Sequence, residues 1–153
     1  MSLKKVMTLC IVHRDDRVLL GMKKRGFGQG RWSRFGGKVM PGELIEDAAR
    51  RELYEEAGVS VGPLETAGNL RFSFLGNPEL LEMHVFRADR VDGEPVETEE
   101  MRPQWFVVED IPFGDMWLDD AYWMPYFLAG KKFCGTFTFN DAHALTDHEL
   151  LEV

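Results

Sequence analysis

The sequence contains few cysteines and no long apolar run. Its two cysteines, Cys10 and Cys134, show neither zinc-ligand spacing nor a disulfide pattern, so reduced, buried thiols are expected. The longest apolar run is far shorter than the ~18 residues that indicate a membrane span, and the N-terminus lacks the layout of a signal peptide. A cytoplasmic protein without a membrane partner is therefore predicted.

Basic charge is also scarce. Lysine and arginine number 18 against 26 aspartates and glutamates, which gives a formal net charge of −8. Proteins that bind long nucleic acid need a basic face, so long nucleic acid is not expected as a partner. A polyphosphate substrate remains possible if a divalent cation accompanies it. Lys23, Lys24 and Arg25 form a short basic run, for which a phosphate contact and a solvated strand end are equally good interpretations.

The 153 residues, 44% of them hydrophobic, are enough for one core without disulfides, so a single domain over residues 1–153 and a monomer are expected. One helix is predicted over Leu44–Ala57. Another starts at Asp119 or Asp120 and runs toward Gly130, with Pro125 in its first turn or at a kink. Strands on both sides of the first helix predict an α+β sandwich built on a mixed sheet. The expected strands are Leu3–Val12, Arg17–Met22, Leu70–Phe74, Leu80–Phe86, Gln104–Val108 and, as the last, Phe133–Phe139, and the segment from Asp141 gives no signal.

One face of the first predicted helix changes from apolar to acidic along its length. The acidic residues stand just before Gly58, the expected left-handed cap, where the helix dipole disfavours negative charge. Each pair of them at i,i+3 or i,i+4 spacing costs about 0.2–0.5 kcal/mol. On the opposite face, Glu46–Arg50 and Asp47–Arg51 are favourable pairs, which leaves the acidic cluster without a partner. The stripe consists of Ile45, Ala48, Ala49, Glu52 and Glu56, with Glu55 beside it.

A hard divalent cation resolves this conflict, because Mg²⁺ prefers oxygen ligands and completes its shell with water and substrate phosphates. A solvated acidic helix end is the alternative, and it would be preferred for two adjacent glutamates alone. The surrounding string favours the metal site. In order along the chain, the string has a glycine, five residues of any type, a glutamate, seven residues of any type and then Arg-Glu. An apolar residue, any residue, Glu-Glu, any residue, a glycine and a final apolar residue follow. The defined positions are Gly37, Glu43, Arg51, Glu52, Leu53, Glu55, Glu56, Gly58 and Val59.

This string resembles the signature of the Nudix hydrolases, and the resemblance implies a Nudix-type α/β/α sandwich with a central mixed sheet. It also implies a Mg²⁺ site, with Mn²⁺ as a possible substitute. Glu56 would be the central ligand and activate water, while Glu43 and Arg51 would orient the cluster. The implied ligands are the carboxylates of Glu52, Glu55 and Glu56 and the carbonyl of Gly37.

Further segments resemble the MutT-homologue oxidised-purine nucleoside triphosphatases, among them Lys23–Gly28, Phe35–Lys38, Glu100–Pro103 and Asp115–Asp120. The resemblance covers nearly the whole chain and weakens after Asn140. It implies hydrolysis of 8-oxo-dGTP and 2-hydroxy-dATP to the monophosphate and pyrophosphate, with Glu100 as a further metal ligand. The implied substrate-binding residues are Thr8, Lys23, Phe27, Ser33, Phe35, Gly36, Gly37, Lys38, Phe72, Phe74, Trp117, Asp119 and Asp120.

Two positions depart from that family. Ser33 stands where the family has an asparagine, and serine lacks the paired donor and acceptor of an amide. Leu81 replaces a methionine. Without the resemblance, Trp117 would be interpreted as a core residue and Asp119 as a helix cap. With the resemblance, Trp117 is interpreted as a flat surface for base stacking, and Asp119 as a residue that hydrogen-bonds the base edge.

The predicted reaction is metal-dependent attack of water on the triphosphate chain, with a small-molecule nucleotide as partner. Two alternatives remain. One is a Nudix hydrolase of another substrate class, such as a dinucleoside polyphosphate or a nucleoside diphosphate sugar. The other is a nucleotide-binding module without catalysis, which the complete carboxylate set argues against.

Overall fold

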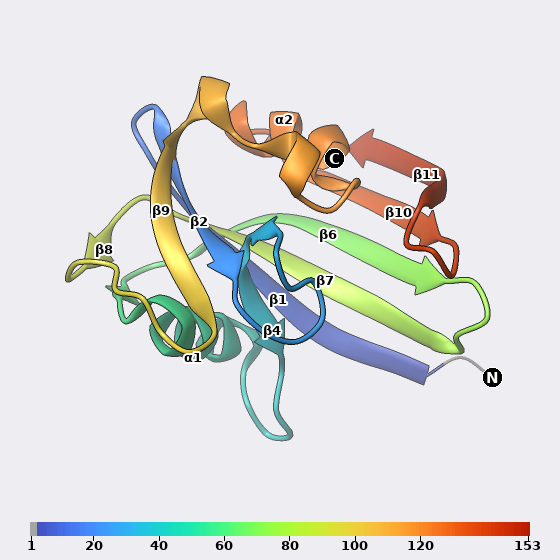
Figure 1. Cartoon of the computed structure of the whole chain (residues 1–153), viewed down its shortest axis with the longest axis horizontal. Helices are drawn as coiled ribbons and strands as arrows, with labels where there is room; N and C mark the ends of the chain where they lie inside the picture. The colour runs from blue at the N-terminus through green and yellow to red at the C-terminus, as the bar shows by residue number, and fades with distance from the viewer. Residues whose placement is uncertain (1–2) are drawn as a thin grey trace.

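A computed structural model describes residues 3–153 and shows a mixed sheet with helices on both sides (Figure 1). The helices are α1 (Ile45–Ala57) and α2 (Asp120–Leu128), and two 3₁₀ turns cover Val108–Asp110 and Phe113–Asp115. The main-sheet strands are β1 (Leu3–Arg14), β2 (Arg17–Lys23), β3 (Trp32–Ser33), β4 (Phe35–Lys38), β6 (Glu65–Phe74), β7 (Glu79–Ala88), β9 (Met101–Val107), β10 (Phe133–Phe139) and β11 (Leu145–Glu152). A separate small ladder joins β5 (Ser60–Val61) to β8 (Val91–Asp92).

The strand order is β11-β10-β6-β7-β1-β2-β3, with β4 also paired to β1 and β9 to β2. Parallel pairing joins β1 to β7 and β6 to β10, and the other pairs are antiparallel. The predicted mixed sheet is therefore confirmed. Within residues 3–153, neither helix has both the length and the apolar character that a membrane crossing requires.

The two helices cover opposite faces of the sheet, and β1 shows why. Successive side chains of a strand point to opposite faces. Leu9 and Ile11 belong to the core that also contains the side chains of α2, whereas Cys10 and Val12 belong to the core that contains the side chains of α1. This arrangement is the predicted α/β/α sandwich.

Several predicted elements need correction. Phe133–Phe139 is not the last strand, because the segment after Asp141 forms β11 and pairs antiparallel with β10. Pro125 lies beyond the first turn of α2, inside the helix. Cys134 is only half-buried, since β10 lies next to the edge strand β11, while Cys10 is fully buried as expected. Burial raises the pKa of the Cys10 thiol to about 12, which leaves it protonated and inert.

Candidate active site

Two cavities meet beside the end of α1. One, of about 260 Å³, is lined largely by aromatic and apolar side chains, and the other, of about 630 Å³, is lined largely by carboxylates. Lys23, Gly36, Gly37 and Glu56 line both cavities. A ligand with a flat ring at one end and a charged chain at the other therefore matches the shape and chemistry of the joined space.

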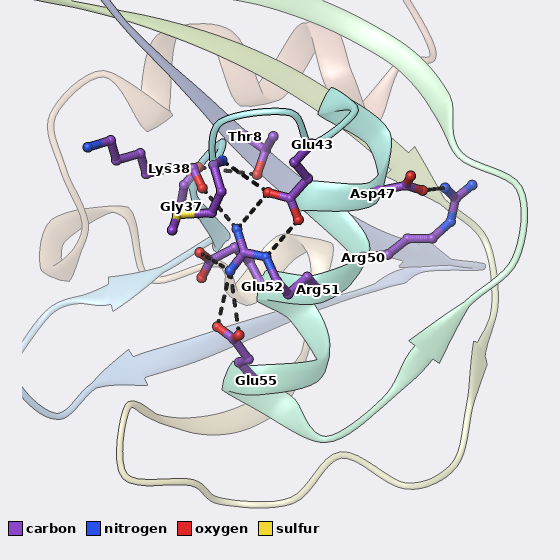
Figure 2. A network of polar contacts seen from close by, with 10 residues as sticks. Thr8, Gly37, Lys38, Glu43, Asp47, Arg50, Arg51, Glu52 and Glu55 are labelled. Atoms are coloured by element: carbon purple, nitrogen blue, oxygen red, sulfur yellow. Dashed lines mark hydrogen bonds and ion pairs between the residues drawn. The ribbon is translucent and has the colours of Figure 1, made fainter.

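Arg51 organises the carboxylate cavity (Figure 2). Its guanidinium makes two hydrogen bonds to Glu43, at 2.8 and 3.0 Å, and it also donates to Glu52 at 3.0 Å and to Glu55 at 3.4 Å. A further bond of 3.0 Å reaches the carbonyl of Lys38 in β4. Arg51 thereby ties the loop before α1, the last turns of α1 and the edge of the sheet together.

These contacts correct two predictions about α1. Asp47 pairs with Arg50 at 3.2 Å and not with Arg51, because Arg51 turns toward the loop and the sheet while Arg50 lies on the other side of the helix (Figure 2). The acidic cluster is also not without a partner, since Glu52 and Glu55 both contact Arg51. The sequence pattern considered only pairs along one helix face, and the actual partners include groups from outside the helix.

Glu56 is the least compensated carboxylate of the cluster. It is 4% exposed, and its Oε1 accepts one hydrogen bond of 2.9 Å from the Gly36 amide. Burial raises the pKa of Glu56 to about 8, while the Gly36 amide opposes the shift and Glu52 adds to it. Burial also raises the pKa of Glu52, against the influence of Arg51. A cation in the cavity would remove the cost of charging both groups.

Glu100 reaches the same cavity from the segment before β9. Arg25 donates from Nε to Glu100 at 3.0 Å, and this hydrogen bond lowers the pKa of Glu100. Lys24 forms an ion pair with Glu97 in the same segment, with Nζ 2.6 Å from the carboxylate oxygen Oε2. The basic run therefore lies at the rim of the cavity, although two of its three members are engaged by carboxylates.

Two adjacent glycines allow β4 to approach its neighbours closely. A Cβ at Gly36 would lie 1.8 Å from the Thr8 carbonyl oxygen, and one at Gly37 would lie 2.5 Å from the Glu52 carboxylate carbon. Neither position tolerates a larger residue without displacement of the backbone or of Glu52. Thr8 is buried, and its Oγ1 donates to the Gly37 carbonyl at 3.4 Å.

The donor set fits a divalent cation chemically. The carboxylates of Glu52, Glu55, Glu56, Glu99 and Glu100 and the Gly37 backbone line one cavity, and Mg²⁺ takes oxygen ligands. Within residues 3–153, no three acidic, histidine or cysteine side chains are already gathered around one point. Arginines pair with Glu52, Glu55 and Glu100, so these side chains would have to turn away from the guanidinium groups to bind one cation together.

The apolar cavity has the predicted aromatic character. Phe27 stacks on Trp117 with ring centroids 5.0 Å apart, and the Arg31 guanidinium lies 4.1 Å from the centre of the Trp117 ring. Phe72 and Phe74 project from β6 into the same cavity. Phe27 lines the cavity and is 62% exposed, so its ring is accessible from solvent.

Asp119 and Asp120 lie at the polar end of this cavity, beside Arg34. Asp119 lines the cavity, whereas Asp120 is fully buried behind it. Asp119 stands at the start of α2 but its side chain does not cap the helix; its Oδ2 accepts a hydrogen bond of 2.8 Å from Trp123 Nε1. The helix-cap interpretation of Asp119 is therefore wrong.

Three other predicted substrate-binding residues, Phe35, Lys38 and Ser33, lie in different surroundings. Phe35 is fully buried in the core on the α1 side of the sheet and lines neither cavity, so the structure gives its predicted substrate contact no support. Lys38 lies in a neighbouring cavity with Lys5. Ser33 lines the aromatic cavity and donates to the Arg34 carbonyl at 3.0 Å.

Sequence reasoning missed Arg34, Arg31 and His143. His143 packs against Phe27 and Trp117, each with ring centroids 5.3 Å apart, from a backbone with φ of 62°. Arg34 is the most informative of the three, because it is 6% exposed and charged residues are rarely buried without a reason. In the sequence, the signal for Arg34 was its position within a segment rich in aromatic residues and glycine, and that pattern does not identify its partner.

Comparison with known proteins agrees with this geometry. The NUDIX domain profile matches residues 3–127. The oxidized purine nucleoside triphosphate hydrolases of Mus musculus and Danio rerio are 56% and 53% identical over 153 residues, which covers 100% of this chain and 98% of each of those proteins. A crystal structure of a MutT protein from Bacillus halodurans superposes with a TM-score of 0.85 at 26% identity and covers 95% of this chain and 97% of that one.

Proposed function

The chain belongs to the Nudix hydrolase family, and from this membership and the geometry of its two joined cavities we propose that it hydrolyses oxidised purine nucleoside triphosphates. The substrates proposed are 8-oxo-dGTP and 2-hydroxy-dATP, and the products are the monophosphate and pyrophosphate. The observation that carries this proposal is the junction at Glu56, where an aromatic cavity suited to a purine opens onto a carboxylate cavity suited to a metal-bound polyphosphate.

Metal dependence is typical of this family, and Mg²⁺ is the ion proposed here, with Mn²⁺ as a substitute. Glu52, Glu55, Glu56, Glu100 and the carbonyl of Gly37 would hold it. When bound, the ion would neutralise charge on the phosphates and on the leaving group. Its charge also offsets the acidity of the protein toward an anionic substrate.

The residues of the chain have distinct proposed tasks. Glu56 keeps one carboxylate oxygen on the Gly36 amide, so its other oxygen, Oε2, is left to take a proton from water. That water forms a bond to phosphorus as the bond between phosphorus and the leaving pyrophosphate oxygen breaks. Arg51 holds Glu52 and Glu55 in place, and Lys23, at the junction of the cavities, faces the phosphates.

Recognition of the base is assigned to the aromatic cavity. Phe27 and Trp117 provide flat surfaces, and base stacking on such rings contributes about 1–3 kcal/mol in single-strand binders. Stacking does not distinguish one base from another, so the polar end with Asp119 must do so. We propose that residues 1–153 act as a single domain and as a monomer.

A substrate panel tests this function. Chromatography of the nucleotide products formed with Mg²⁺ gives the rate for 8-oxo-dGTP, 2-hydroxy-dATP, dGTP and dATP, with pyrophosphate as the second product. The same method follows the mononucleotides formed from a dinucleoside polyphosphate and a nucleoside diphosphate sugar, which are the competing classes. The oxidised triphosphates are expected to give the highest kcat/KM. A preference for either competing class, or binding without turnover of any compound, would overturn the proposal.

A further inference from the structure

A further cavity, of about 520 Å³, lies against the aromatic cavity. Lys5, Lys38 and His143 belong to its lining, and we call it the outer cavity. The side chains that line both cavities form the wall between them, and they are those of Met7, Phe27, Phe74 and Leu81. His143 therefore reaches this wall from the side away from the proposed base.

Phe27 is the part of this wall that depends most on contacts with other side chains. It lies in the loop between β2 and β3 and is 62% exposed, whereas Phe74 belongs to β6. The Phe27 ring lies 5.0 Å from Trp117 and 6.2 Å from Phe74 between centroids. The His143 ring meets Phe27 edge-on, 5.3 Å away at an interplanar angle of 75°, which is a favourable geometry for two aromatic rings. His143 also lies 5.3 Å from Trp117 and 6.2 Å from Phe74, so one ring supports the other three.

The backbone of His143 has an unusual conformation. Its φ of 62° lies in the left-handed region, which residues other than glycine adopt at a cost in free energy. The turn between β10 and β11 fixes this conformation. Asn140 Oδ1 accepts hydrogen bonds from the amides of Ala142 and Ala144 at 2.9 and 3.0 Å, and the His143 amide donates to the Asn140 carbonyl at 3.0 Å. The strained backbone thus holds the His143 ring at one place, against the wall.

We propose that His143 is a specificity-determining positioning residue, which supports Phe27 and keeps the wall between the two cavities closed, so that purines with a bulky aryl substituent are excluded. Without the His143 ring, Phe27 loses its support on the outer side, and an aryl group on the purine can extend into the outer cavity. The proposal rests on the proposed function, because it concerns the base of the same substrate.

The test measures kcat/KM for pairs of triphosphates, each made of a parent purine nucleotide and the same nucleotide with an aryl group. The pairs are dGTP with N2-benzyl-dGTP, dGTP with 8-phenyl-dGTP and dATP with N6-benzyl-dATP, so that three positions of the purine are covered. The wild type should favour every parent by at least about tenfold, the lower end of the discrimination that a hydrophobic pocket achieves for one methylene group.

His143→Asn removes the ring and keeps the turn, because asparagine tolerates a left-handed backbone. It should lower the preference for the parent at least about tenfold in the pair whose aryl group meets the wall, and the change should appear in KM more than in kcat. His143→Phe keeps a flat ring but fits the left-handed backbone less well. It should therefore be the less stable of the two variants and still retain the wild-type preference. If His143 served only stability, preference and stability would change together.

His148→Asn is the matched control. His148 also packs on aromatic rings, with centroids 4.2 Å from Tyr122 and 5.8 Å from Phe137, but it lies on β11 outside both cavities. This substitution should leave every preference unchanged. Calorimetric titration with the corresponding monophosphates in metal-free buffer should show the same change in preference for His143→Asn without any chemistry. If the Asn variant does not fold, His143→Gly, which also suits the left-handed backbone, replaces it.

Four results would overturn the proposal and leave His143 a residue of the turn only. They are an unchanged preference in all three pairs, an equal loss for parent and arylated nucleotides, the same change in the His148 variant, and failure of both the Asn and the Gly variant to fold. Failure of the proposed function would look different. In that case the wild-type protein would not hydrolyse 8-oxo-dGTP, while the preference among monophosphates in calorimetry would still depend on His143.

Discussion

The amide of Gly36 donates a 2.9 Å hydrogen bond to Glu56 Oε1, and this contact joins β4 to the last turn of α1 at the boundary between the two cavities. The bond fixes one oxygen of a carboxylate that is otherwise buried and poorly compensated. Glu56 is therefore a poorly compensated carboxylate that lines both cavities. Its substitution gives the sharpest tests of the site.

Glu56→Gln should reduce kcat by at least about 10²-fold, in line with the loss of a general base, while fold and nucleotide binding persist. The amide keeps the shape but cannot take a proton or ligate a cation as strongly. Steady-state kinetics at saturating Mg²⁺ measures the effect. Glu46→Gln, on the exposed face of α1 beside Arg50, is the control and should leave kcat unchanged. Near-normal kcat in the Glu56 variant would refute its assignment.

In metal-free buffer, the free energy of unfolding should fall as the pH rises from about 4.5 to about 8. The folded protein retains the Glu56 proton in this window because its pKa is raised to about 8, whereas the unfolded chain has already released it. The slope from this group is at most about 1.4 kcal/mol per pH unit. Urea titrations in EDTA at pH 5, 6.5 and 8 measure it.

Glu56→Gln should remove this pH dependence and be more stable than the wild type at pH 8. Added Mg²⁺ should raise the thermal midpoint of the wild type, because an ion that binds only the folded state stabilises it. A wild-type thermal midpoint that does not change on addition of Mg²⁺, with and without nucleotide, would argue against a metal site.

Arg51→Lys and Arg50→Lys form a matched pair on adjacent positions of α1. Arg51 makes two bonds to Glu43 and further contacts to Glu52 and Glu55, and a lysine cannot reproduce this fork. A loss of about 1–3 kcal/mol of stability and a higher Mg²⁺ requirement are expected. Arg50→Lys alters only exposed contacts, with Glu46, Asp47 and the Gly62 carbonyl, and should change stability by less than about 0.5 kcal/mol. Equal effects of the two substitutions in denaturation and Mg²⁺ titration would contradict the role of Arg51.

Asp119→Asn should change which purine is accepted more than it changes the chemistry. The side chain lines the aromatic cavity, and an amide presents one acceptor oxygen and one donor NH₂ group where the carboxyl group presents two oxygens. The ratio of kcat/KM for 8-oxo-dGTP to that for dGTP is expected to fall substantially, with a smaller loss for dGTP. An equal ratio in wild type and variant would show that Asp119 serves only the Trp123 hydrogen bond and Arg34.

Local patterns in the sequence determined the elements and the carboxylate helix. The strands over Leu3–Val12 and Leu70–Phe74, the left-handed Gly58 with φ of 71° and the acidic turn before it all follow from short-range stereochemistry and local sequence pattern, and they were predicted. The mixed sheet and the two-sided core follow from the order of those elements. The segment of β11 was missed because an edge strand has few buried residues and hence little alternation.

Long-range contacts were decided only by the tertiary structure. Arg51 binds Glu43 and the Lys38 carbonyl instead of Asp47, because the loop before α1 and β4 place those oxygens on its side of the helix. Arg34 meets Asp120, 86 positions away in the sequence, because β3, β4 and the start of α2 converge at the polar end of the cavity. A sequence pattern records which groups are near each other along one element, whereas burial and charge compensation depend on which elements the folded chain brings together.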